Sequence, residues 1–385
     1  MKSSSKREGN YRKGSSAICR TNDSQDSCLN GMIVEEEMHT MKAVVYYGAG
    51  DIRIENIPVP DCGRDEIRVK VEACAVCGTD LKSYKFGNPR IKAPLTIGHE
   101  FSGTIETVGE EVTGYMEGER IVMATSVSCG GCYYCRNGWN NLCTNLAPMG
   151  FSYPGGMTEY VIIPSLAIKN GHVVKVPDGI EAQLAALAEP LSCAVNACEN
   201  IGIKDGDVVV VIGAGPLGLM NIYVARKNGA GKIILSQRSK QRREKAKTLG
   251  CEVVVDPENE DLVSIVHEET GGLGADAVIV TAPAKEPQEL ALDLVRKRGT
   301  VCLFASLPSD NSLIKIDSRR IHYGEIKITG SSDSTARHVR RAIDFLRKND
   351  FPRNILVSHV LGLEEIFRAF DLMTSRKAMR VVLRP

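Results

Sequence analysis

Four cysteines between residues 129 and 143 have the spacing of a metal site. Cys129, Cys132, Cys135 and Cys143 read C-x2-C-x2-C-x7-C within the run SCGGCYYCRNGWNNLC. Four thiolates at such short spacing can converge on one zinc ion, and the two glycines after the first cysteine allow a tight turn. Disulfides or an iron–sulfur cluster would use the same residue type, but nothing indicates an oxidising compartment and the C-x3-C-P of bacterial ferredoxins is missing. We expect a closed, structural zinc site.

A second set of metal-binding side chains is spread along the chain. Cys77 opens Cys-Gly-Thr-Asp after an alternating stretch, 67–74, that predicts a strand; His99 and Glu100 follow in Gly-His-Glu, and Glu189 precedes a proline much later. Thiolate, imidazole and carboxylate together suit a catalytic zinc, which keeps one position open for substrate. Taken singly, each of these residues also has an ordinary explanation as packing or capping.

A glycine-rich turn in the second half predicts a dinucleotide site. The apolar run 207–212 leads directly into Gly213-Ala214-Gly215-Pro216-Leu217-Gly218 and then into a helical pattern over 219–228. G-x-G-x-x-G between a strand and a helix is a strong signal, because the glycines permit a tight turn and a close approach of the backbone to a pyrophosphate. The N–H groups at the start of the helix favour phosphate.

The residues after the next strand bear on the choice of cofactor. An acidic residue there would bind the adenosine ribose and select NAD, but the run Ser236–Arg243 reads SQRSKQRR. Arg238 and the hydroxyls of Ser236 and Ser239 could instead hold a 2′-phosphate, with Arg242 nearby, and positive charge at a helix start is unfavourable without an anion. The run therefore favours NADP over NAD; the alternative is that these bases only line a solvated helix.

Strand and helix patterns alternate through this half, which predicts a doubly wound parallel sheet in an α/β protein. The expected strands are 232–235, 252–255, 275–280, 300–304 and 326–329, with helices such as 239–249 and 288–298 between them. Further helical patterns, 338–348 and 363–374, lie in the last segment of the chain.

Composition places the chain among ordinary globular proteins. The 385 residues have a net charge of +1, 43% hydrophobic and 25% charged residues, which excludes a disordered chain and a polyanion binder driven by net charge. Aromatic residues are few, which argues against a surface that stacks on the bases of single-stranded nucleic acid. No apolar run approaches the length of a membrane-spanning helix. We expect no nucleic-acid partner, no membrane partner and a cytoplasmic protein.

Residues 1–40 lack a sustained apolar stretch and a secretory h-region. We therefore expect a disordered extension or a start codon placed too early; a transit peptide fits the pattern less well.

The motifs occur along the chain in one order: Cys-Gly-Thr-Asp, Gly-His-Glu, the four-cysteine loop, Glu-Pro and Gly-x-Gly-x-x-Gly. This order resembles the zinc-dependent medium-chain dehydrogenase/reductase family, from about Met41 to the C-terminus. The polyol branch, that of sorbitol and threonine dehydrogenases, is the more similar. Glu189-Pro190-Leu191-Ser192 stands where other alcohol dehydrogenases typically have a cysteine ligand.

The resemblance implies two zinc ions and a role for each motif. Cys77 and His99 would bind the catalytic zinc, with Glu100 and Glu189 as ligands or close neighbours and Cys193 as an alternative. The four cysteines would bind the structural zinc. In addition, Asp80 would orient the catalytic site and Thr79 would hydrogen-bond the reacting oxygen and pass its proton outward. The implied catalytic residues are Thr79, Cys77, His99 and Glu100.

The resemblance also implies how the cofactor is held. Gly213, Gly215, Leu217 and Gly218 would lie along it, and Arg242 matches an arginine that contacts its adenosine end. NAD-using polyol dehydrogenases carry Asp at the position of Gln237, and the difference puts NAD use in doubt.

The family layout is a GroES-like, mostly β catalytic domain that a Rossmann cofactor domain interrupts. It predicts a catalytic domain over 41–191, a cofactor domain over 192–329 and a return segment over 330–385. A homodimer or homotetramer is typical of the family.

The expected activity is hydride transfer between NAD(P) and a secondary alcohol of a polyol or sugar derivative. The alternatives are another secondary alcohol, such as an L-threonine-like amino alcohol or a sugar phosphate, and a non-catalytic module that binds zinc and NADP. The substrate would be bound by loops, with Tyr84, Lys85, Phe151 and Tyr153 as candidates. A basic residue in the cleft, Lys82, Lys85 or Arg90, would favour a phosphorylated sugar.

Overall fold

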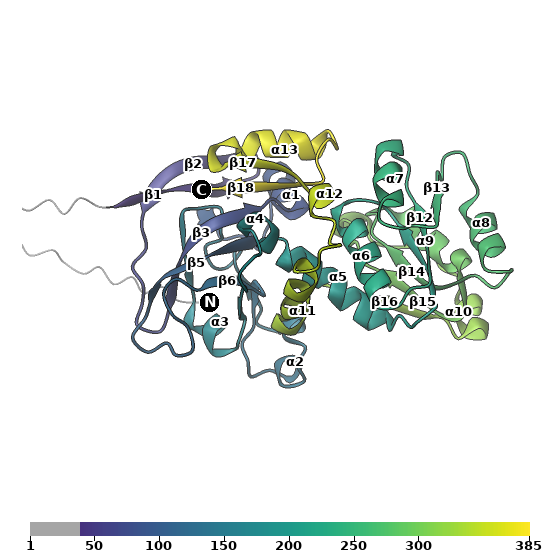
Figure 1. Cartoon of the computed structure of the whole chain (residues 1–385), viewed down its shortest axis with the longest axis horizontal. Helices are drawn as coiled ribbons and strands as arrows, with labels where there is room; N and C mark the ends of the chain where they lie inside the picture. The colour runs from purple at the N-terminus through teal and green to yellow at the C-terminus, as the bar shows by residue number, and fades with distance from the viewer. Residues whose placement is uncertain (1–38) are drawn as a thin grey trace, which may run out of the picture. The chain divides into compact units, whose positions relative to one another are not determined.

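A computed structural model describes residues 39–385 (Figure 1). The N-terminal extension expected at residues 1–40 lies outside the described residues, apart from its last two. The first strand, β1 (Thr40–Gly48), starts one residue before Met41, where we expected the fold to begin. No helix among the described residues combines the length and the apolar character that a membrane crossing requires.

The first part of the chain is built around a mostly antiparallel sheet with β3 (Ile67–Ala75) at its centre. Apolar and polar side chains alternate along β3, so one face is buried while Arg68 and Lys70 point away from the core. The sheet order is β10-β6-β5-β3-β18-β17, with β9 also paired to β3. These strands are β5 (Glu100–Val108), β6 (Arg120–Met123), β9 (Tyr160–Ile163), β10 (Val173–Lys175), β17 (Val357–Gly362) and β18 (Arg380–Arg384).

The end of the chain therefore returns to the sheet where the chain began. β18 pairs with β3, with Val382 opposite Ala75, and the yellow β17 and β18 lie beside the purple β3 in Figure 1. Two small sheets complete this part: β2 (Asp51–Pro58), β1 and β4 (Leu95–Thr96), and β7 (Ser126–Val127) with β8 (Ala147–Pro148). Its short helices are α1 (Gly78–Phe86), α2 (Tyr133–Arg136), η1 (Asn140–Leu142), α3 (Ser165–Lys169) and α4 (Ala182–Ala185).

The second half forms the predicted doubly wound sheet, with six parallel strands in the order β13-β12-β11-β14-β15-β16. The strands are β11 (Val208–Ile212), β12 (Lys232–Ser236), β13 (Val253–Val255), β14 (Ala275–Val280), β15 (Val295–Leu303) and β16 (Lys327–Gly330). Helices alternate with them: α5 (Ala188–Ile201), α6 (Pro216–Lys227), α7 (Lys240–Lys247), α8 (Leu262–Glu269), α9 (Lys285–Leu294) and α10 (Ser318–Gly324). After β16 come α11 (Ala336–Leu346), α12 (Arg353–Leu356) and α13 (Ile366–Thr374), with η2 (Ser309–Asn311) and η3 (Leu363–Glu365) as single 3₁₀ turns.

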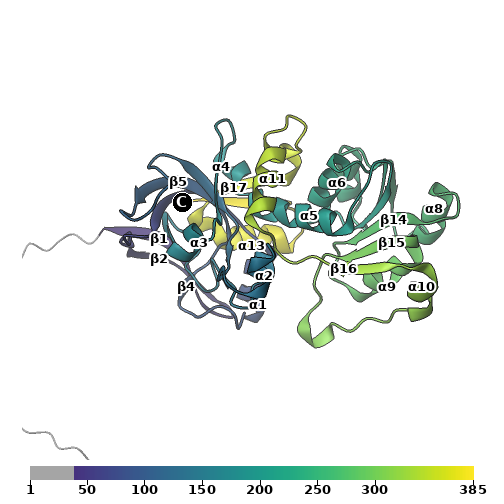
Figure 2. The ribbon, with the colours of Figure 1, turned by 90° about the horizontal axis from the view of Figure 1, so that it is seen from below.

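Helices cover both faces of this sheet (Figure 2). Val209 and Val211 of β11 pack on one face with side chains of α5, α6 and α7. Val210 and Ile212 pack on the other face with side chains of α8 and α9. A strand that is apolar on both sides reads as a continuous hydrophobic run, which is why VVVVI marks β11 so clearly in the sequence.

One predicted helix is wrong at its end. The helical pattern over 288–298 predicted a helix to Arg298, whereas α9 ends at Leu294 and β15 begins at Val295. Val295 pairs with Ala275, and Arg296 Nε donates a hydrogen bond of 2.6 Å to the Asp276 carboxylate. These contacts with β14 are long-range, so they override the local helical pattern.

Candidate active site and metal centres

A cavity of about 830 Å³ gathers most of the predicted site residues. Those that line it are Cys77, Thr79, His99, Glu100, Glu189, Gly215, Leu217, Gly218 and Arg242. The metal-binding side chains come from the β3–α1 and β4–β5 turns and from α5, whereas the glycines come from the turn between β11 and α6. Gly213, Gln237 and Arg238 are not part of the lining.

The turn after β3 fixes Cys77 and its neighbours. Cys77 is the N-cap of α1, and its N–H donates a 2.8 Å hydrogen bond to Asp80 Oδ2, which closes the first turn of the helix. The Thr79 hydroxyl oxygen lies 3.6 Å from Cys77 Sγ. The start of α1 therefore holds the thiol, the hydroxyl and the carboxylate in one place.

Strand pairing brings Gly-His-Glu to the same point. Glu100 is the first residue of β5 and stands opposite Ala75 of β3, two residues before Cys77. His99 is buried, and its Nδ1 has no hydrogen-bond partner among residues 39–385 but lies 3.6 Å from Asp80 Oδ1. Cys77, His99 and Glu100 each offer a ligand atom, and these atoms lie within 4.8 Å of one another.

Glu100 also faces a buried cation from the end of the chain. Arg380 Nη1, on β18, lies 2.9 Å from Glu100 Oε2 and donates a hydrogen bond of 3.2 Å to the carbonyl oxygen of Val76. Both charged side chains are almost completely buried, with 5% and 1% exposed. The arginine thus compensates the carboxylate beside His99.

Glu189 lies in a neighbouring group on the cavity wall. Glu189, Cys193 and Asp333 each offer a ligand atom, and these atoms also lie within 4.8 Å of one another. The Cys193 thiol donates a hydrogen bond of 3.7 Å to Glu189 Oε1. Burial raises the pKa of Glu189 to about 8, and the charge of Glu100 adds to this shift.

The residues around Cys77 fit a zinc ion. Thiolate, imidazole and carboxylate are the donors that a catalytic zinc uses. Burial by itself would lower the pKa of His99, but the acidic Cys77 and Asp80 outweigh it and raise that pKa well above its usual value. Several acidic groups thus face one buried point, where a divalent cation would neutralise them.

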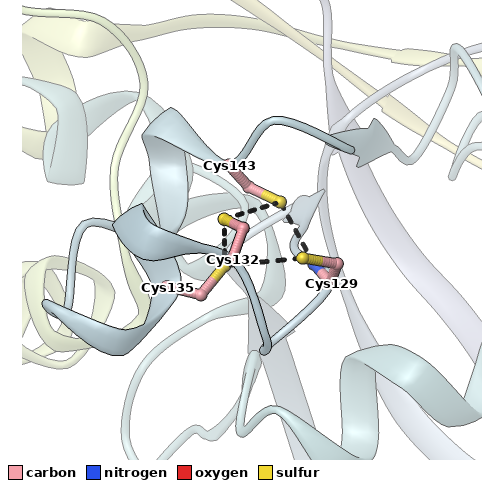
Figure 3. Close-up of side chains that lie close together, drawn as sticks. All are labelled: Cys129, Cys132, Cys135 and Cys143. Carbon is pink, nitrogen blue, oxygen red and sulfur yellow. Dashed lines mark hydrogen bonds between the residues drawn. The ribbon is translucent and has the colours of Figure 1, made fainter.

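The four-cysteine loop forms a second cluster, which Figure 3 shows. The Sγ atoms of Cys129, Cys132, Cys135 and Cys143 lie within 4.8 Å of one another, and all four thiols are free of disulfides. Neighbouring sulfur atoms are 3.5 to 4.0 Å apart. A tetrahedral site with Zn–S bonds of about 2.3 Å has S–S edges of about 3.8 Å, so the spacing suits a single zinc ion.

Backbone N–H groups donate hydrogen bonds to the sulfurs of Cys132 and Cys143. The N–H groups of Cys129 and Asn145 donate hydrogen bonds of 3.2 and 3.3 Å to Cys143 Sγ. The N–H groups of Cys135 and Thr144 lower the pKa of Cys132 to about 5. Thiolates are the form that binds zinc, so these hydrogen bonds favour binding at Cys132, whereas burial raises the pKa of Cys143 to about 12.

The glycine turn has the geometry that a dinucleotide needs. Gly213 follows β11 with a φ of +109°, which a side chain would strain, and a Cβ on Gly218 would overlap the carbonyl oxygen of Gly213. Gly215 is open on its outer side, where the nearest atom to a Cβ would be Arg242 Nη1 at 3.9 Å. The turn presents the N-terminus of α6 to the cavity.

Two arginines of the basic run after β12 differ in whether their guanidinium groups have partners. Arg243 pairs with Asp256 at 2.8 Å and donates hydrogen bonds to the carbonyl oxygens of Gln237 and Arg238. Among the described residues, the guanidinium of Arg242 has neither a hydrogen bond nor an ion pair, and burial followed by the charge of Arg376 lowers its pKa. A half-buried cation without a counter-ion is suited to an anionic ligand.

Only some of the candidate substrate-binding residues line the cavity. Lys82, Arg90 and Phe151 line it, with the Arg90 guanidinium 5.2 Å from the centre of the Phe151 ring. Tyr84 instead stacks on Phe370 of α13 at 5.3 Å. Tyr153 and Lys85 are absent from the cavity lining, and Lys85 donates a hydrogen bond to Thr374.

Sequence reasoning missed two residues of this site, Asp333 and Arg380. Both line the cavity, although they lie far from the other motifs in the sequence. The polar run Gly330–Thr335, between β16 and α11, was the signal for Asp333. For Arg380 no local signal exists, because a basic residue in a terminal apolar strand has many explanations.

Comparison with known proteins agrees with this arrangement. Residues 63–178 match the alcohol dehydrogenase GroES-like domain, and residues 216–348 match the zinc-binding dehydrogenase family. The chain is 34% identical over 352 residues to a sorbitol dehydrogenase of Halalkalibacterium halodurans, with 90% of this chain and 99% of the relative covered. It is 33% identical over 359 residues to an L-threonine 3-dehydrogenase of Pyrococcus abyssi, with 90% and 98% covered.

A solved structure has the same architecture. The crystal structure of a zinc-binding dehydrogenase from Sinorhizobium meliloti 1021, bound to NADP, superposes with a TM-score of 0.84 at 31% identity, and the match covers 90% of this chain and 100% of that one. The predicted fold, a GroES-like part and a Rossmann part, is thereby confirmed, as is the predicted enzyme class. The chain belongs to the zinc-dependent medium-chain dehydrogenase/reductase family, in its polyol-dehydrogenase-like branch, as an oxidoreductase of small alcohols that uses zinc and NAD(P).

Proposed function

We propose that this protein interconverts a secondary alcohol of a polyol or sugar derivative and the corresponding ketone, with NADP preferred to NAD. One observation carries the proposal. The same cavity is lined by the ligand set of Cys77, His99 and Glu100 and by the Gly215–Gly218 turn that suits a dinucleotide. A metal site and a nicotinamide site that share one cavity suit hydride transfer from a metal-activated alcohol to the nicotinamide, or from the reduced nicotinamide to a metal-activated ketone.

Each side chain around the first ligand set has a role in this proposal. Cys77, His99 and Glu100 bind the catalytic zinc, and Glu189 completes the site from α5, directly or through a water molecule. Asp80 orients His99 across the 3.6 Å gap to its Nδ1. The four-cysteine cluster binds a second, structural zinc.

The reaction removes a proton and a hydride from the alcohol. Cys77, His99 and Glu100 would hold a zinc ion that would supply Lewis acidity at the substrate hydroxyl, and the Gly215–Gly218 turn would hold the dinucleotide that would take up the hydride. Thr79 would accept a hydrogen bond from the substrate hydroxyl and take its proton while releasing its own proton to water in the cavity, so that the threonine ends as a neutral hydroxyl. The apolar wall at Phe151 and Leu142 limits the access of water to the carbon that reacts.

The preference for NADP rests on charge at the end of β12. No carboxylate is present in the run Ser236–Arg243, and the nearby Asp256 is already paired with Arg243. Arg242 has no counter-ion among the described residues, and Arg238 is exposed at the end of the strand. We propose that these two arginines bind the phosphates of the cofactor, Arg238 at the 2′-phosphate.

Two further proposals concern organisation. The catalytic domain would consist of residues 41–191 and 330–385, which is supported by the pairing of β18 with β3, and the cofactor domain of residues 192–329. The protein would act as a homodimer or homotetramer, as is typical of its family.

Substrates with an anionic group are a second candidate class. Lys82 and Arg90 line the cavity and could pair with the phosphate of a sugar phosphate or the carboxylate of an amino alcohol such as L-threonine. Neither side chain has an acidic partner within 4 Å among residues 39–385. Substrates with an anionic group are therefore included in the rate assays described next.

Initial rates with polyols, sugar phosphates, L-threonine and simple secondary alcohols, each with NADP and with NAD, test the proposal. We expect oxidation of a free polyol with NADP, lost after chelation and restored by zinc. Turnover of a sugar phosphate or of L-threonine alone would favour the second class. Equal use of both cofactors would contradict the proposed role of Arg238.

A further inference from the structure

Asp333 occupies an unusual backbone position beside the proposed catalytic zinc site. It lies in the loop between β16 and α11 with a φ of +58°, a left-handed conformation that side chains other than glycine rarely adopt. Aspartate tolerates this region better than most residues, but the conformation still costs free energy. Such strain persists where the surrounding contacts hold the residue in place.

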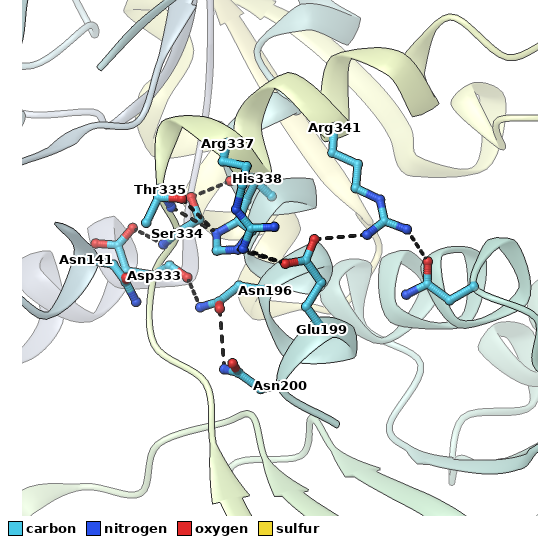
Figure 4. Close-up of polar contacts among 12 residues, drawn as sticks. Asn141, Asn196, Glu199, Asn200, Asp333, Ser334, Thr335, Arg337, His338 and Arg341 are labelled. Carbon is cyan, nitrogen blue, oxygen red and sulfur yellow. Dashed lines mark hydrogen bonds and ion pairs between the residues drawn. The ribbon is translucent and has the colours of Figure 1, made fainter. Parts of the chain in front are cut away.

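Three hydrogen bonds hold Asp333, from α5, from β7 and from the next residue of its own loop. Figure 4 shows the contact with Asn196 of α5. The Asn196 side-chain amide, on α5, donates 2.8 Å to the carbonyl oxygen of Asp333. The backbone N–H of Ser334 donates 2.7 Å to Oδ1, and the Ser126 hydroxyl on β7 donates to Oδ2. The carboxylate therefore has one orientation rather than several.

The next helix is fixed just as firmly to α5. Glu199, one turn after Asn196, pairs with Arg337 at 2.7 Å and with Arg341 at 2.9 Å, and its carboxylate lies 3.3 Å from His338 Nε2. Figure 4 shows these side chains converging on the glutamate from α11. The loop that carries Asp333 thus runs between two anchored elements, and the position of its carboxylate is set in advance of substrate binding.

The carboxylate of Asp333 faces the cavity rather than the protein core. Asp333 lines the cavity together with Glu189 and Cys193, to which one of its oxygens lies within 4.8 Å. Each carboxylate oxygen accepts one hydrogen bond from the protein and keeps a further lone pair for another donor. On the same loop, Ser331 lines the cavity, and its buried Oγ has no hydrogen-bond partner among the described residues.

An unpaired buried hydroxyl and a carboxylate with spare acceptor capacity both suit a polar ligand at this wall. A monohydric alcohol, which has only the hydroxyl that reacts, would leave both groups unpaired. A substrate with a second hydrogen-bond donor on the adjacent carbon would satisfy the carboxylate.

We propose that Asp333 is a specificity-determining residue that accepts a hydrogen bond from a second donor, a hydroxyl or an ammonium group, on the carbon next to the one that is oxidised. The inference rests on the proposed function, because it places the reacting carbon at the Cys77–His99–Glu100 ligand set. It adds that the protein recognises vicinal diols and amino alcohols through this carboxylate.

The substitution Asp333→Asn tests the proposal, because it keeps the size of the side chain and removes its charge. Three substrates that differ in one group are compared: 2,3-butanediol, 3-amino-2-butanol and 2-butanol. We expect the ratio of kcat/KM for the diol or the amino alcohol to that for 2-butanol to fall about tenfold or more, as when a hydrogen bond to a charged group is lost. The exposed Asp344→Asn on α11 removes the same charge nearby and should keep the parent ratio.

A loss confined to the diol identifies a hydroxyl as the donor, and a loss confined to the amino alcohol identifies an ammonium group. An equal loss on all three substrates overturns the proposal in favour of a purely structural Asp333, and so does an unchanged ratio. Calorimetric binding of the diol to the zinc- and NADP-loaded protein separates this inference from the proposed function. If the parent oxidises no alcohol, the proposed function fails, and weaker diol binding by Asp333→Asn still supports the inference, whereas unchanged or absent binding overturns it.

Discussion

Arg380 Nη1 lies 2.9 Å from Glu100 Oε2, so the last strand of the chain neutralises a carboxylate beside His99. The pairing of β18 with β3 sets this contact, because it brings the end of the chain alongside the turn that carries Cys77. Assembly of the proposed catalytic site thus depends on residues about 280 positions apart in sequence, as the pairing of Glu100 with Arg380 shows.

We predict that Arg380→Met destabilises the zinc-free protein by about 3–5 kcal/mol, because without the metal it leaves the Glu100 carboxylate buried without a counter-ion. Urea unfolding followed by fluorescence measures the free energy of unfolding. Arg384→Met, at the exposed end of the same strand, is the matched control and should change it by less than about 0.5 kcal/mol. Similar losses in the two variants would contradict the proposed importance of the buried pair.

The sequence predicted the parts of the site whose chemistry is local. Cysteines three residues apart, or a glycine turn between a strand and a helix, report their geometry directly, and Cys132 and Gly218 lie where that geometry requires. Likewise, the apolar run before Gly213 predicted β11 to within one residue, because burial on both faces leaves a continuous signal.

Features that depend on distant contacts were beyond sequence reasoning. The end of α9 at Leu294 is determined by pairing with β14, which no local window contains. The position of Asp333 beside Glu189 depends on the path of the loop between β16 and α11. The roles of the candidate ligands stay predictions, which metal analysis can test.

We predict two zinc ions per chain and that Cys135→Ser removes one of them. Zinc prefers four thiolates in a closed site, and a serine oxygen is a poor replacement for the sulfur that lies 3.5 Å from Cys132 Sγ. Elemental analysis of the purified protein should show the zinc content fall from about two to about one per chain, with loss of stability because the metal supports the fold of the loop. Cys62→Ser, outside both clusters, should retain two. A zinc content that Cys135→Ser leaves unchanged would refute the closed site.

We predict that Arg238→Ala and Arg242→Ala affect the two cofactors differently. Arg238 is proposed to bind the 2′-phosphate, so its loss should lower the NADP-to-NAD ratio of kcat/KM by about tenfold or more. Arg242 lies beside Gly215, so its loss should weaken both cofactors alike. Lys247→Ala, at the far end of α7, is the control for removing one positive charge. An unchanged ratio in Arg238→Ala would remove the charge basis for NADP preference.

We predict that Glu199→Gln destabilises the protein at neutral pH and has little effect on its stability in acid. Burial by itself would raise the pKa of Glu199, but hydrogen bonds from Arg341 and Arg337 outweigh it and hold the pKa below its usual value. The charged carboxylate therefore stabilises the folded protein above about pH 4.3, the value in the unfolded chain, and this contribution disappears as the pH falls through the lower, folded pKa. Urea unfolding at a series of pH values between 7 and 3 should show Glu199→Gln clearly less stable than the parent at pH 7 and nearly equal to it at pH 3. A constant difference across that range would mean that the packing of the side chain, rather than its charge, joins α5 to α11.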